Sequence, residues 1–464
     1  MRGSDATTCR RLLVCALCAL LCVAALPTGV VGQPDGSSDD GTVAIDYRYE
    51  HTGDPGTVRV TAEATVPANV TELSVELPSN ASDVRAADFG GDGDTLEWER
   101  DGGDGSRRIE LSYRVAVNET DDGSLEDVST REWALFNWRG TDLRVGYAHT
   151  GTDPGVTERA VVPERAGVAG ETYVYLGPYS TRSRTVNGET IRLVVPRAAN
   201  GSTDATATLD ALATAARDLR VDAGRERLTA FVAPAPIEAT GRFSRAGDGG
   251  ARDMYVSASA RLNTPDSAWL HEFTHSRQAY ETDESMAWFD DASAEYYGAL
   301  LTYRQGRISE AAFAEYVRAE RERDAVLAEA GAGDASYFKG MRVLAALDAT
   351  IRERSDGRRS LEDVLRRMNR HEGTVSYADF ARFVAWAAGE PLDEWLDTYV
   401  RGEAAPEVDV GPLTAGATVE PADPNASANL VEAVRTAPPT GWALFLAGAA
   451  LALATTVTLR RRRG

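Results

Sequence analysis

One pentapeptide of the sequence combines residue types that could perform hydrolysis: His271-Glu272-Phe273-Thr274-His275. The segment is predicted to be helical, and two histidines four residues apart lie on one face of a helix, close enough to bind one zinc ion. The glutamate between them points about 100° around the helix, where a general base could reach a metal-bound water. Such pairs also occur by chance on ordinary surface helices, so the site needs further support from the chain.

A catalytic zinc ion requires a third protein ligand and one open position for water. The next predicted helix, Trp288 to Tyr297, offers two carboxylates, Asp291 and Glu295. They are four residues apart and therefore share one helical face. One of them could bind zinc while the other fixes the tautomer of a ligand histidine. The alternative for both is a solvated acidic face.

These two segments resemble the gluzincin metallopeptidases, the thermolysin-like group that includes aminopeptidase N and the glycyl aminopeptidases. In that group, HExxH is followed by a helix reading W-x-x-E-G-x-A-x-Y, whose glutamate is the third zinc ligand. This chain reads W-F-D-D-A-S-A-E-Y-Y, so the resemblance places Asp291 at the ligand position, with a side chain one methylene shorter. Glu295 is the rival ligand, because it lies 20 residues after His275, a spacing that thermolysin-like sites also use.

A third segment, Tyr337-Phe338-Lys339-Gly340, matches the Y-x-K-G pattern of the aminopeptidase N group and contains the only lysine of the chain. The resemblance implies that Tyr337 donates a hydrogen bond to the oxyanion that develops during hydrolysis. The alternative is a core tyrosine on a packed helix. The resemblance extends over about residues 170–405.

One element of those aminopeptidases has no counterpart in the sequence. They carry a G-x-M-E-N-type strand before the zinc helix, and its glutamate holds the free amine of the substrate. The corresponding stretch was expected at Arg252 to Ala258, where Asp253 is the only carboxylate. The substrate is therefore predicted only as a peptide or protein, with endopeptidase and aminopeptidase activity both open.

Hydrophobic periodicity predicts the elements that position these residues. Alternating segments separated by Asp/Gly turns predict a β-rich domain over residues 33–160. Strands continue at residues 171–176, 190–195, 227–233 and 254–259, an amphipathic helix is predicted over 205–219, and residues 286–400 are nearly all helical. The predicted fold class is α+β: an N-terminal β-sandwich followed by a mostly helical, thermolysin-like metallopeptidase domain over residues 161–405.

The two ends of the sequence indicate export and anchoring. Residues 1–32 resemble a signal peptide and hold all four cysteines. Residues 406–440 are typical of a stalk, residues 441–459 carry no charge and predict a transmembrane helix, and residues 460–464 form a basic tail. By the positive-inside rule this tail is cytoplasmic, which predicts a single-pass cell-membrane protein with its ectodomain outside.

The charge balance excludes one class of partner. The formal net charge is −22, with a single lysine among 49 basic residues, so nucleic acid is not expected to bind. This acidic, lysine-poor composition resembles that of secreted proteins from extremely halophilic archaea. Five N-x-S/T sequons are glycosylation candidates: Asn69, Asn80, Asn118, Asn200 and Asn425.

Together these patterns predict a membrane-anchored, outward-facing zinc metallopeptidase. One Zn²⁺ would be bound by His271, His275 and Asp291, with Glu272 as general base and Tyr337 as oxyanion donor. The rival hypothesis is a non-catalytic surface protein, with a binding or structural role, that retains the same scaffold. Hydrolysis of a non-peptide bond is a third possibility.

Overall fold

The computed structural model describes residues 41–91, 93–118, 125–199, 201, 203–224, 226–237, 239–245, 252–330, 333 and 335–415. The predicted signal peptide, transmembrane helix, basic tail and most of the stalk lie outside these residues, as do Asn200 and Asn425. Among the helices of the described ranges, none has the length and apolar character needed to cross a bilayer.

The N-terminal part is a β domain, as predicted. Its larger sheet has the order β10-β1-β2-β6-β4, from β1 (Val43–His51), β2 (Thr57–Val66), β4 (Ala81–Arg85), β6 (Arg107–Ala116) and β10 (Val156–Val161). A second sheet has the order β5-β3-β9, from β3 (Val70–Glu76), β5 (Thr95–Glu99) and β9 (Arg144–His149). Side chains from both sheets form one apolar core, and strands such as β2 alternate buried and half-buried positions, the pattern of a sandwich.

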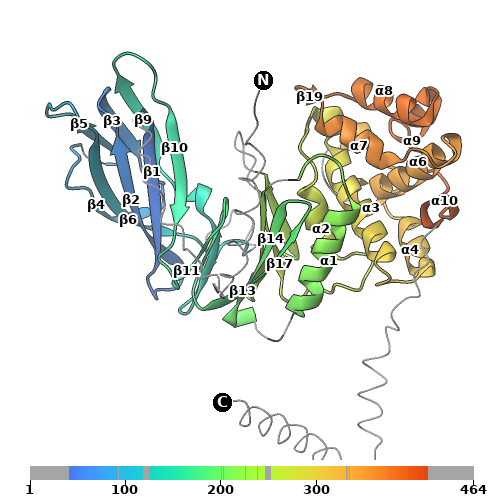
Figure 1. Cartoon of the computed structure of the whole chain (residues 1–464), viewed down its shortest axis with the longest axis horizontal. Helices are drawn as coiled ribbons and strands as arrows, with labels where there is room; N and C mark the ends of the chain where they lie inside the picture. The colour runs from blue at the N-terminus through green and yellow to red at the C-terminus, as the bar shows by residue number, and fades with distance from the viewer. Residues whose placement is uncertain are drawn as a thin grey trace, which may run out of the picture.

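A small sheet joins this domain to the next one. Its order is β11-β12-β8-β7, from β7 (Val128–Ser129), β8 (Ala134–Asn137), β11 (Gly167–Ala169) and β12 (Tyr173–Leu176). Its aromatic side chains, among them Trp133 and Tyr175, pack against Phe231 and Tyr255 of the following sheet. Figure 1 shows the resulting arrangement, with the β domain at one end, the helices at the other and the following sheet between them.

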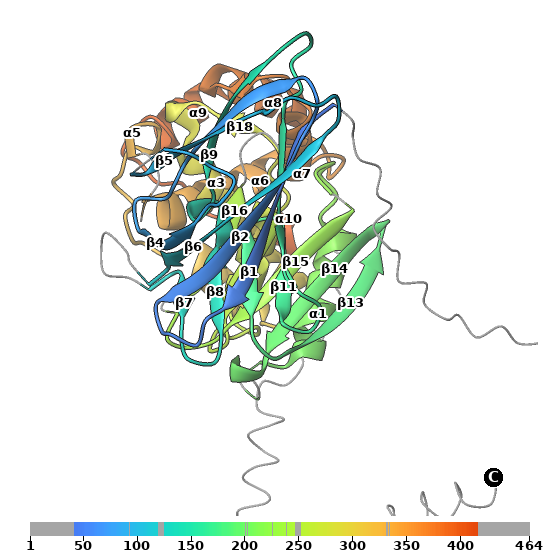
Figure 2. The ribbon, with the colours of Figure 1, turned by 90° about the vertical axis from the view of Figure 1, so that its left-hand side faces the viewer.

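The central sheet has the order β13-β14-β15-β17-β16. Its strands are β13 (Tyr179–Val186), β14 (Glu189–Pro196), β15 (Arg227–Ala233), β16 (Gly241–Arg245) and β17 (Arg252–Ser257). The three inner strands are parallel and the two outer strands antiparallel to their neighbours. Both faces of the sheet are covered, which explains the continuous apolar run of β15. Figure 2 views the molecule from the β-domain side.

Helices cover the other face of the central sheet and extend beyond it, confirming the predicted helical domain. They are α1 (Ala205–Asp218), α2 (Ala268–His275), α3 (Trp288–Arg304), α4 (Glu310–Val317), α5 (Leu327–Ala330), α6 (Met341–Arg354), α7 (Leu361–Asn369), α8 (Tyr377–Ala388), α9 (Asp393–Tyr399) and α10 (Gly411–Thr414). Short elements complete the chain: η1 (Trp138–Gly140), η2 (Arg197–Ala199), η3 (Glu284–Met286), the π-helical turn η4 (Ser336–Gly340), β18 (Glu281–Thr282) and β19 (Thr374–Val375). Capping boxes begin α7 and α8, and Gly389 ends α8 in the left-handed conformation.

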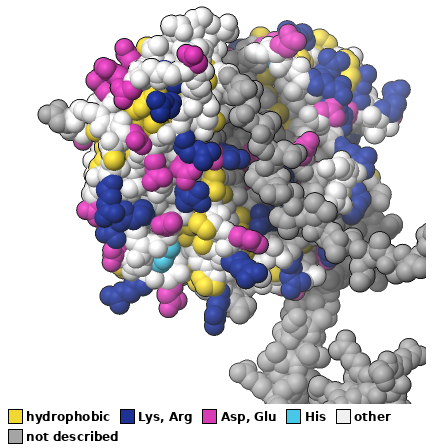
Figure 3. Space-filling model, turned by 60° about the vertical axis from the view of Figure 1, so that its left-hand side comes forward, with side chains coloured by type: hydrophobic (Ala, Val, Ile, Leu, Met, Phe, Trp, Pro, Cys, Tyr) yellow, Lys and Arg dark blue, Asp and Glu magenta, His cyan; other side chains and the backbone are white. Residues whose placement is uncertain are grey.

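Charges on the surface are mixed in sign. On the face shown in Figure 3, basic and acidic side chains are interspersed. The β domain carries exposed or half-exposed ion pairs such as Arg48–Glu63 and Arg159–Asp46. Within the same domain the sequon residues Asn69, Asn80 and Asn118 hydrogen-bond to nearby backbone groups, and their glycosylation stays a prediction.

Asp253 of β17 links the small sheet to the central sheet. Its side chain is 2% exposed, and its carboxylate accepts hydrogen bonds from the backbone N–H of Thr172 at 2.8 Å and of Tyr173 at 3.3 Å. A Cβ at Gly170 would lie 2.0 Å from that carboxylate, so only glycine permits the contact. Asp253, the only carboxylate of the stretch Arg252 to Ala258, is therefore buried between two sheets.

Asp253 also makes stability depend on pH. Burial raises its pKa to about 6, although the two backbone hydrogen bonds lower it. Because the folded state holds the proton more tightly than the unfolded chain, this carboxyl stabilises the fold most below pH 4 and loses that contribution as pH rises through 6, a change of about 3 kcal/mol. Asp253→Asn, which cannot ionise, should therefore gain thermal stability relative to the parent protein between pH 4 and pH 7. Thermal midpoints are measured across this pH range for the parent protein and the variant, with the exposed Asp94→Asn as control. If the midpoints of the parent and of Asp253→Asn changed by the same amount with pH, this assignment would be contradicted.

Candidate metal centre

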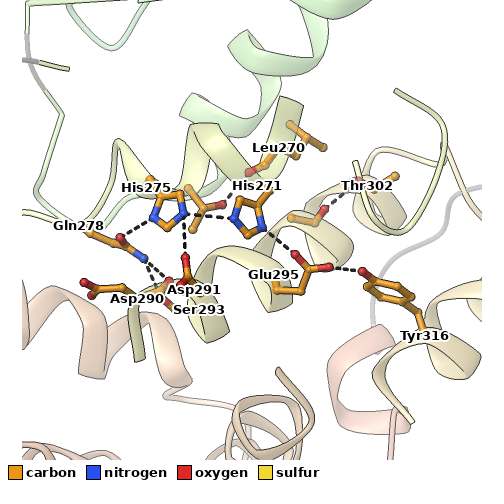
Figure 4. A network of polar contacts seen from close by, with 12 residues as sticks. Leu270, His271, His275, Gln278, Asp290, Asp291, Ser293, Glu295, Thr302 and Tyr316 are labelled. Carbon is orange, nitrogen blue, oxygen red and sulfur yellow. Dashed lines mark hydrogen bonds and ion pairs between the residues drawn. The ribbon is translucent and has the colours of Figure 1, made fainter. Parts of the chain in front are cut away.

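The close packing of α2 and α3 builds the site (Figure 4). His271 and Glu272 of α2 are 8% and 7% exposed. Gly298 of α3 faces the backbone of His271, and a Cβ there would lie 3.2 Å from the His271 nitrogen. The absence of a side chain at this position lets α3 approach closely enough for its short acidic residues to reach the histidines.

Three side chains direct ligand atoms at one point. The Nε2 atoms of His271 and His275 are 3.1 Å apart, and Asp291 Oδ1 lies 3.5 Å from His275 Nε2. Two nitrogens that bind one zinc ion tetrahedrally at about 2.1 Å lie roughly 3.3 Å apart, so this spacing fits a shared ion. Within the described ranges, no other group of His, Cys, Asp and Glu residues converges in this way.

The opposite ring nitrogens are held by hydrogen bonds. His271 Nδ1 contacts Glu295 Oε2 at 2.7 Å, and Glu295 also accepts a hydrogen bond from the Tyr316 hydroxyl. His275 Nδ1 contacts Gln278 Oε1 at 2.9 Å. A proton held on each Nδ1 leaves the Nε2 lone pairs directed at the metal position.

The two carboxylates that share a face of α3 contact different nitrogen atoms of the histidines. Asp291 contributes the oxygen beside the Nε2 atoms, whereas Glu295 contacts the ring nitrogen on the far side of His271. Gln278 holds the beginning of α3 in place, because its amide donates to the Asp290 carbonyl at 2.7 Å and to Ser293 Oγ at 2.8 Å. The geometry therefore favours Asp291 as the ligand and Glu295 as the residue that orients His271.

The electrostatic field of the site favours a cation. Burial acts to lower the pKa of His271, but the hydrogen bond to Glu295 and the nearby charges of Glu272, Glu295 and Asp291 outweigh it, and the pKa is raised. Burial raises the pKa of Glu272 to about 7, and the charges of Asp291 and Glu295 add to this effect. A divalent ion among these groups would relieve their mutual repulsion and lower the pKa of Glu272.

Glu272 itself faces the edge strand β16. A Cβ at Gly241 would lie 2.7 Å from Glu272 Oε1, so glycine leaves room for the carboxylate. On the same strand, the Phe243 ring stacks on His275 with centroids 6.1 Å apart. A cavity of about 380 Å³ opens here, lined by Gly241, Arg242, Phe243, His271, Glu272, His275, Ala287, Asp290, Asp291 and Tyr337. Cavities of about 580 and 810 Å³ elsewhere contain no histidine, so volume alone does not locate the metal centre.

Tyr337 reaches this cavity from η4. Its ring stacks on His271 with centroids 5.6 Å apart and an interplanar angle of 11°. Burial and the charge of Asp291 raise its pKa, so the hydroxyl keeps its proton and can donate it in a hydrogen bond. A π-helical turn inserted before a regular helix is a common feature of functional sites.

The other residues of the Y-x-K-G segment hold η4 in place. Lys339 is fully buried, and its ammonium donates to the carbonyls of Ala325 at 2.5 Å and Gly402 at 2.8 Å. Gly340 packs against α3, where a Cβ would come within 2.6 Å of the Ala292 side chain. Lys339 and Gly340 therefore have structural roles, while Tyr337 alone faces the cavity.

The strand beside the site differs from the one expected from the sequence. The stretch Arg252 to Ala258 was expected to face the substrate, but it forms β17, an inner strand of the sheet. The edge strand next to α2 is β16, which hydrophobic periodicity did not predict. A Pro-rich turn before it and the Gly-rich residues 246–250 after it are signals of a hairpin that could have identified it.

The sequence matches no family model and no curated protein. The fold is similar to that of an aminopeptidase N family protein from Idiomarina loihiensis, with a TM-score of 0.56, 13% identity, and coverage of 80% of this chain and 78% of that chain. An M1 zinc metallopeptidase from Deinococcus radiodurans has a TM-score of 0.47 and 16% identity, covering 79% and 94%. Aminopeptidase A of Legionella pneumophila, in complex with aspartic acid, has a TM-score of 0.43 and 12% identity, covering 78% and 49%. The likeness to the Idiomarina loihiensis protein confirms the resemblance to the aminopeptidase N group at the level of the fold.

Metal affinity should separate Asp291 from Glu295. Asp291→Ala removes a ligand oxygen and should lower zinc affinity by more than 100-fold. Glu295→Ala removes a hydrogen bond to a ligand and should lower it by about 10–100-fold. Zinc titration by calorimetry, with the exposed Glu315→Ala of α4 as control, measures both losses. A larger loss in Glu295→Ala than in Asp291→Ala would reverse the assignment.

Proposed function

We propose that the protein is a zinc-dependent metallopeptidase. The observation that carries this proposal is the convergence of His271, His275 and Asp291 on one point of a cavity that Glu272 and Tyr337 also line. The similarity of the fold to an aminopeptidase N family protein supports it. Zinc bound by these three side chains would polarise the scissile carbonyl and lower the pKa of a bound water.

Glu272 is the proposed general base. It is almost completely buried beside the two histidines but does not contribute to the converging ligand atoms. Its carboxylate would take a proton from the attacking water and pass it to the departing amine. Gly241 keeps the space next to this carboxylate open.

Tyr337 is the proposed oxyanion donor. This residue lines the cavity, and its hydroxyl keeps its proton because burial and the charge of Asp291 raise its pKa. A hydrogen bond to the developing negative charge stabilises the transition state more than the uncharged carbonyl of the substrate.

Strand β16 provides a binding surface for a peptide. It is the last strand of the central sheet, and among the described strands none pairs with its outer side. An extended peptide could add to this edge through backbone hydrogen bonds, which would bring its carbonyl groups toward the metal position. Such main-chain recognition fits peptide or protein substrates.

The proposed location of the protein rests on its sequence. The apolar run at residues 441–459 with the arginines that follow, together with the signal-like residues 1–32, supports a single-pass anchor and an outward-facing enzyme. The acidic composition with a single lysine supports a protein that stays soluble and functions at high salt concentration.

Replacing the proposed base should abolish turnover without removing the metal. Glu272→Gln should lower kcat by about 10²–10⁴-fold on a mixture of synthetic peptides read by mass spectrometry, because proton transfer is lost. The zinc content, measured by atomic absorption, should stay at one ion per chain. Glu315→Gln serves as the matched control, and the parent protein with chelator gives the background. Unchanged turnover in Glu272→Gln would exclude the mechanism.

Loss of the phenol should affect the chemical step rather than binding. Tyr337→Phe keeps the ring that stacks on His271 but cannot donate a hydrogen bond, so kcat should fall by about 10²–10³-fold with little change in KM. Steady-state kinetics on the best-cleaved peptide test this. If only KM rose, Tyr337 would be a substrate contact and not an oxyanion donor.

A further inference from the structure

Arg242 stands out among the residues that line the metal cavity. It lies on β16 between Gly241 and Phe243, and it is the only arginine or lysine in the described lining. The acidic residues of the lining include Glu272, the proposed general base, and Asp291, whose carboxylate faces the metal position. Arg242 has no part in the proposed hydrolytic step.

A partner from the small sheet keeps the guanidinium at the rim of the cavity. Arg242 forms an ion pair with Glu126, which immediately precedes Asp127 and β7. The two side chains remain 48% and 38% exposed. An ion pair at such exposure contributes only about 0–1 kcal/mol, and a guanidinium has five N–H donors, so a second carboxylate can bind the same group.

Arg242 lies close to the proposed general base. It directly follows Gly241, whose Cβ position would lie 2.7 Å from Glu272 Oε1, and Arg242 and Glu272 line the same cavity. A substrate group bound to Arg242 would therefore stand near the cleaved bond. The described edge strand itself, Gly-Arg-Phe-Ser-Arg, contains two arginines and no acidic residue, in a chain of net charge −22.

We propose that Arg242 selects peptides that carry a carboxylate close to the cleaved bond. This inference rests on the proposed peptidase function and names its substrate class. The carboxylate can be an aspartate or glutamate side chain, or the terminal α-carboxylate of a short peptide. In each case a charge-assisted, two-point contact with the planar guanidinium orients the substrate.

Matched peptide pairs test the inference with the full chain in its zinc-loaded form. Cleavage of a synthetic peptide mixture first identifies the best substrate. Variants of that peptide then carry Glu or Gln, in turn, at each position within three residues of the bond, and a free or amidated C-terminus. For one of these pairs, the carboxylate member should have a kcat/KM about tenfold above its amide partner, the size expected for one charge-assisted contact.

Arg242→Gln should bring this ratio close to one, and Arg242→Lys should retain part of it, because lysine keeps the charge but not the planar fork. Arg184→Gln is the matched control: Arg184 lies on β13, the opposite edge of the same sheet, and forms an exposed ion pair with Asp210. It should leave the ratio unchanged. The Glu/Gln pairs identify a side-chain carboxylate and the free/amidated pairs an α-carboxylate. Raising the salt concentration should reduce the ratio, because exposed charges are screened.

The outcomes distinguish this inference from the function on which it depends. Cleavage with equal rates for all pairs, or a preference that survives in Arg242→Gln, would overturn the role of Arg242 and leave the peptidase intact. A zinc-loaded chain that cleaves no peptide would overturn the proposed function and, with it, the substrate class.

Discussion

The close approach of α3 to α2 is the constraint on which the metal centre depends. An aspartate reaches less far than a glutamate, so Asp291 can stand beside His275 only if the two helix backbones nearly touch. Gly298 allows this on one side, since a Cβ there would lie 3.2 Å from the His271 nitrogen. Gly340 allows η4 to follow α3 closely on the other side. The short side chain of Asp291 therefore depends on the two glycines that allow the close packing.

The same packing assigns different roles to the two carboxylates of α3. Asp291 and Glu295 occupy one face of one helix, and sequence spacing alone could not assign their roles. The rotation of α3 against α2 places one oxygen beside the Nε2 atoms and the other beside Nδ1 of His271. Burial raises the pKa of Glu272, and the nearby charges of Asp291 and Glu295 raise it further. Metal affinity and proton transfer are in this sense coupled through one cluster of charges.

Local patterns predicted much of the fold, and distant contacts account for what was missed. The strand over residues 227–233 and the helix from residue 205 were predicted well, because the periodicity that identifies them lies within each element. The pair of histidines in the HEFTH segment could be recognised in the same way, because their four-residue spacing lies within one helix. Strand β16 is short and lies at an edge, and the pairing of Arg242 with Glu126 joins residues more than one hundred positions apart. Tyr316, which supports Glu295, likewise belongs to another helix. Hydrophobic periodicity describes single elements and does not predict contacts between residues of different elements.

The single lysine, Lys339, links the turn η4 to a segment near the end of the described chain. Its ammonium binds the carbonyl of Gly402, which follows the last helix but one of the described chain. A nascent chain that has not yet supplied Gly402 lacks one of the two acceptors that hold η4 against α3. The turn that bears Tyr337 therefore gains its second anchor only after the chain has been made as far as Gly402, which is nearly the whole described domain.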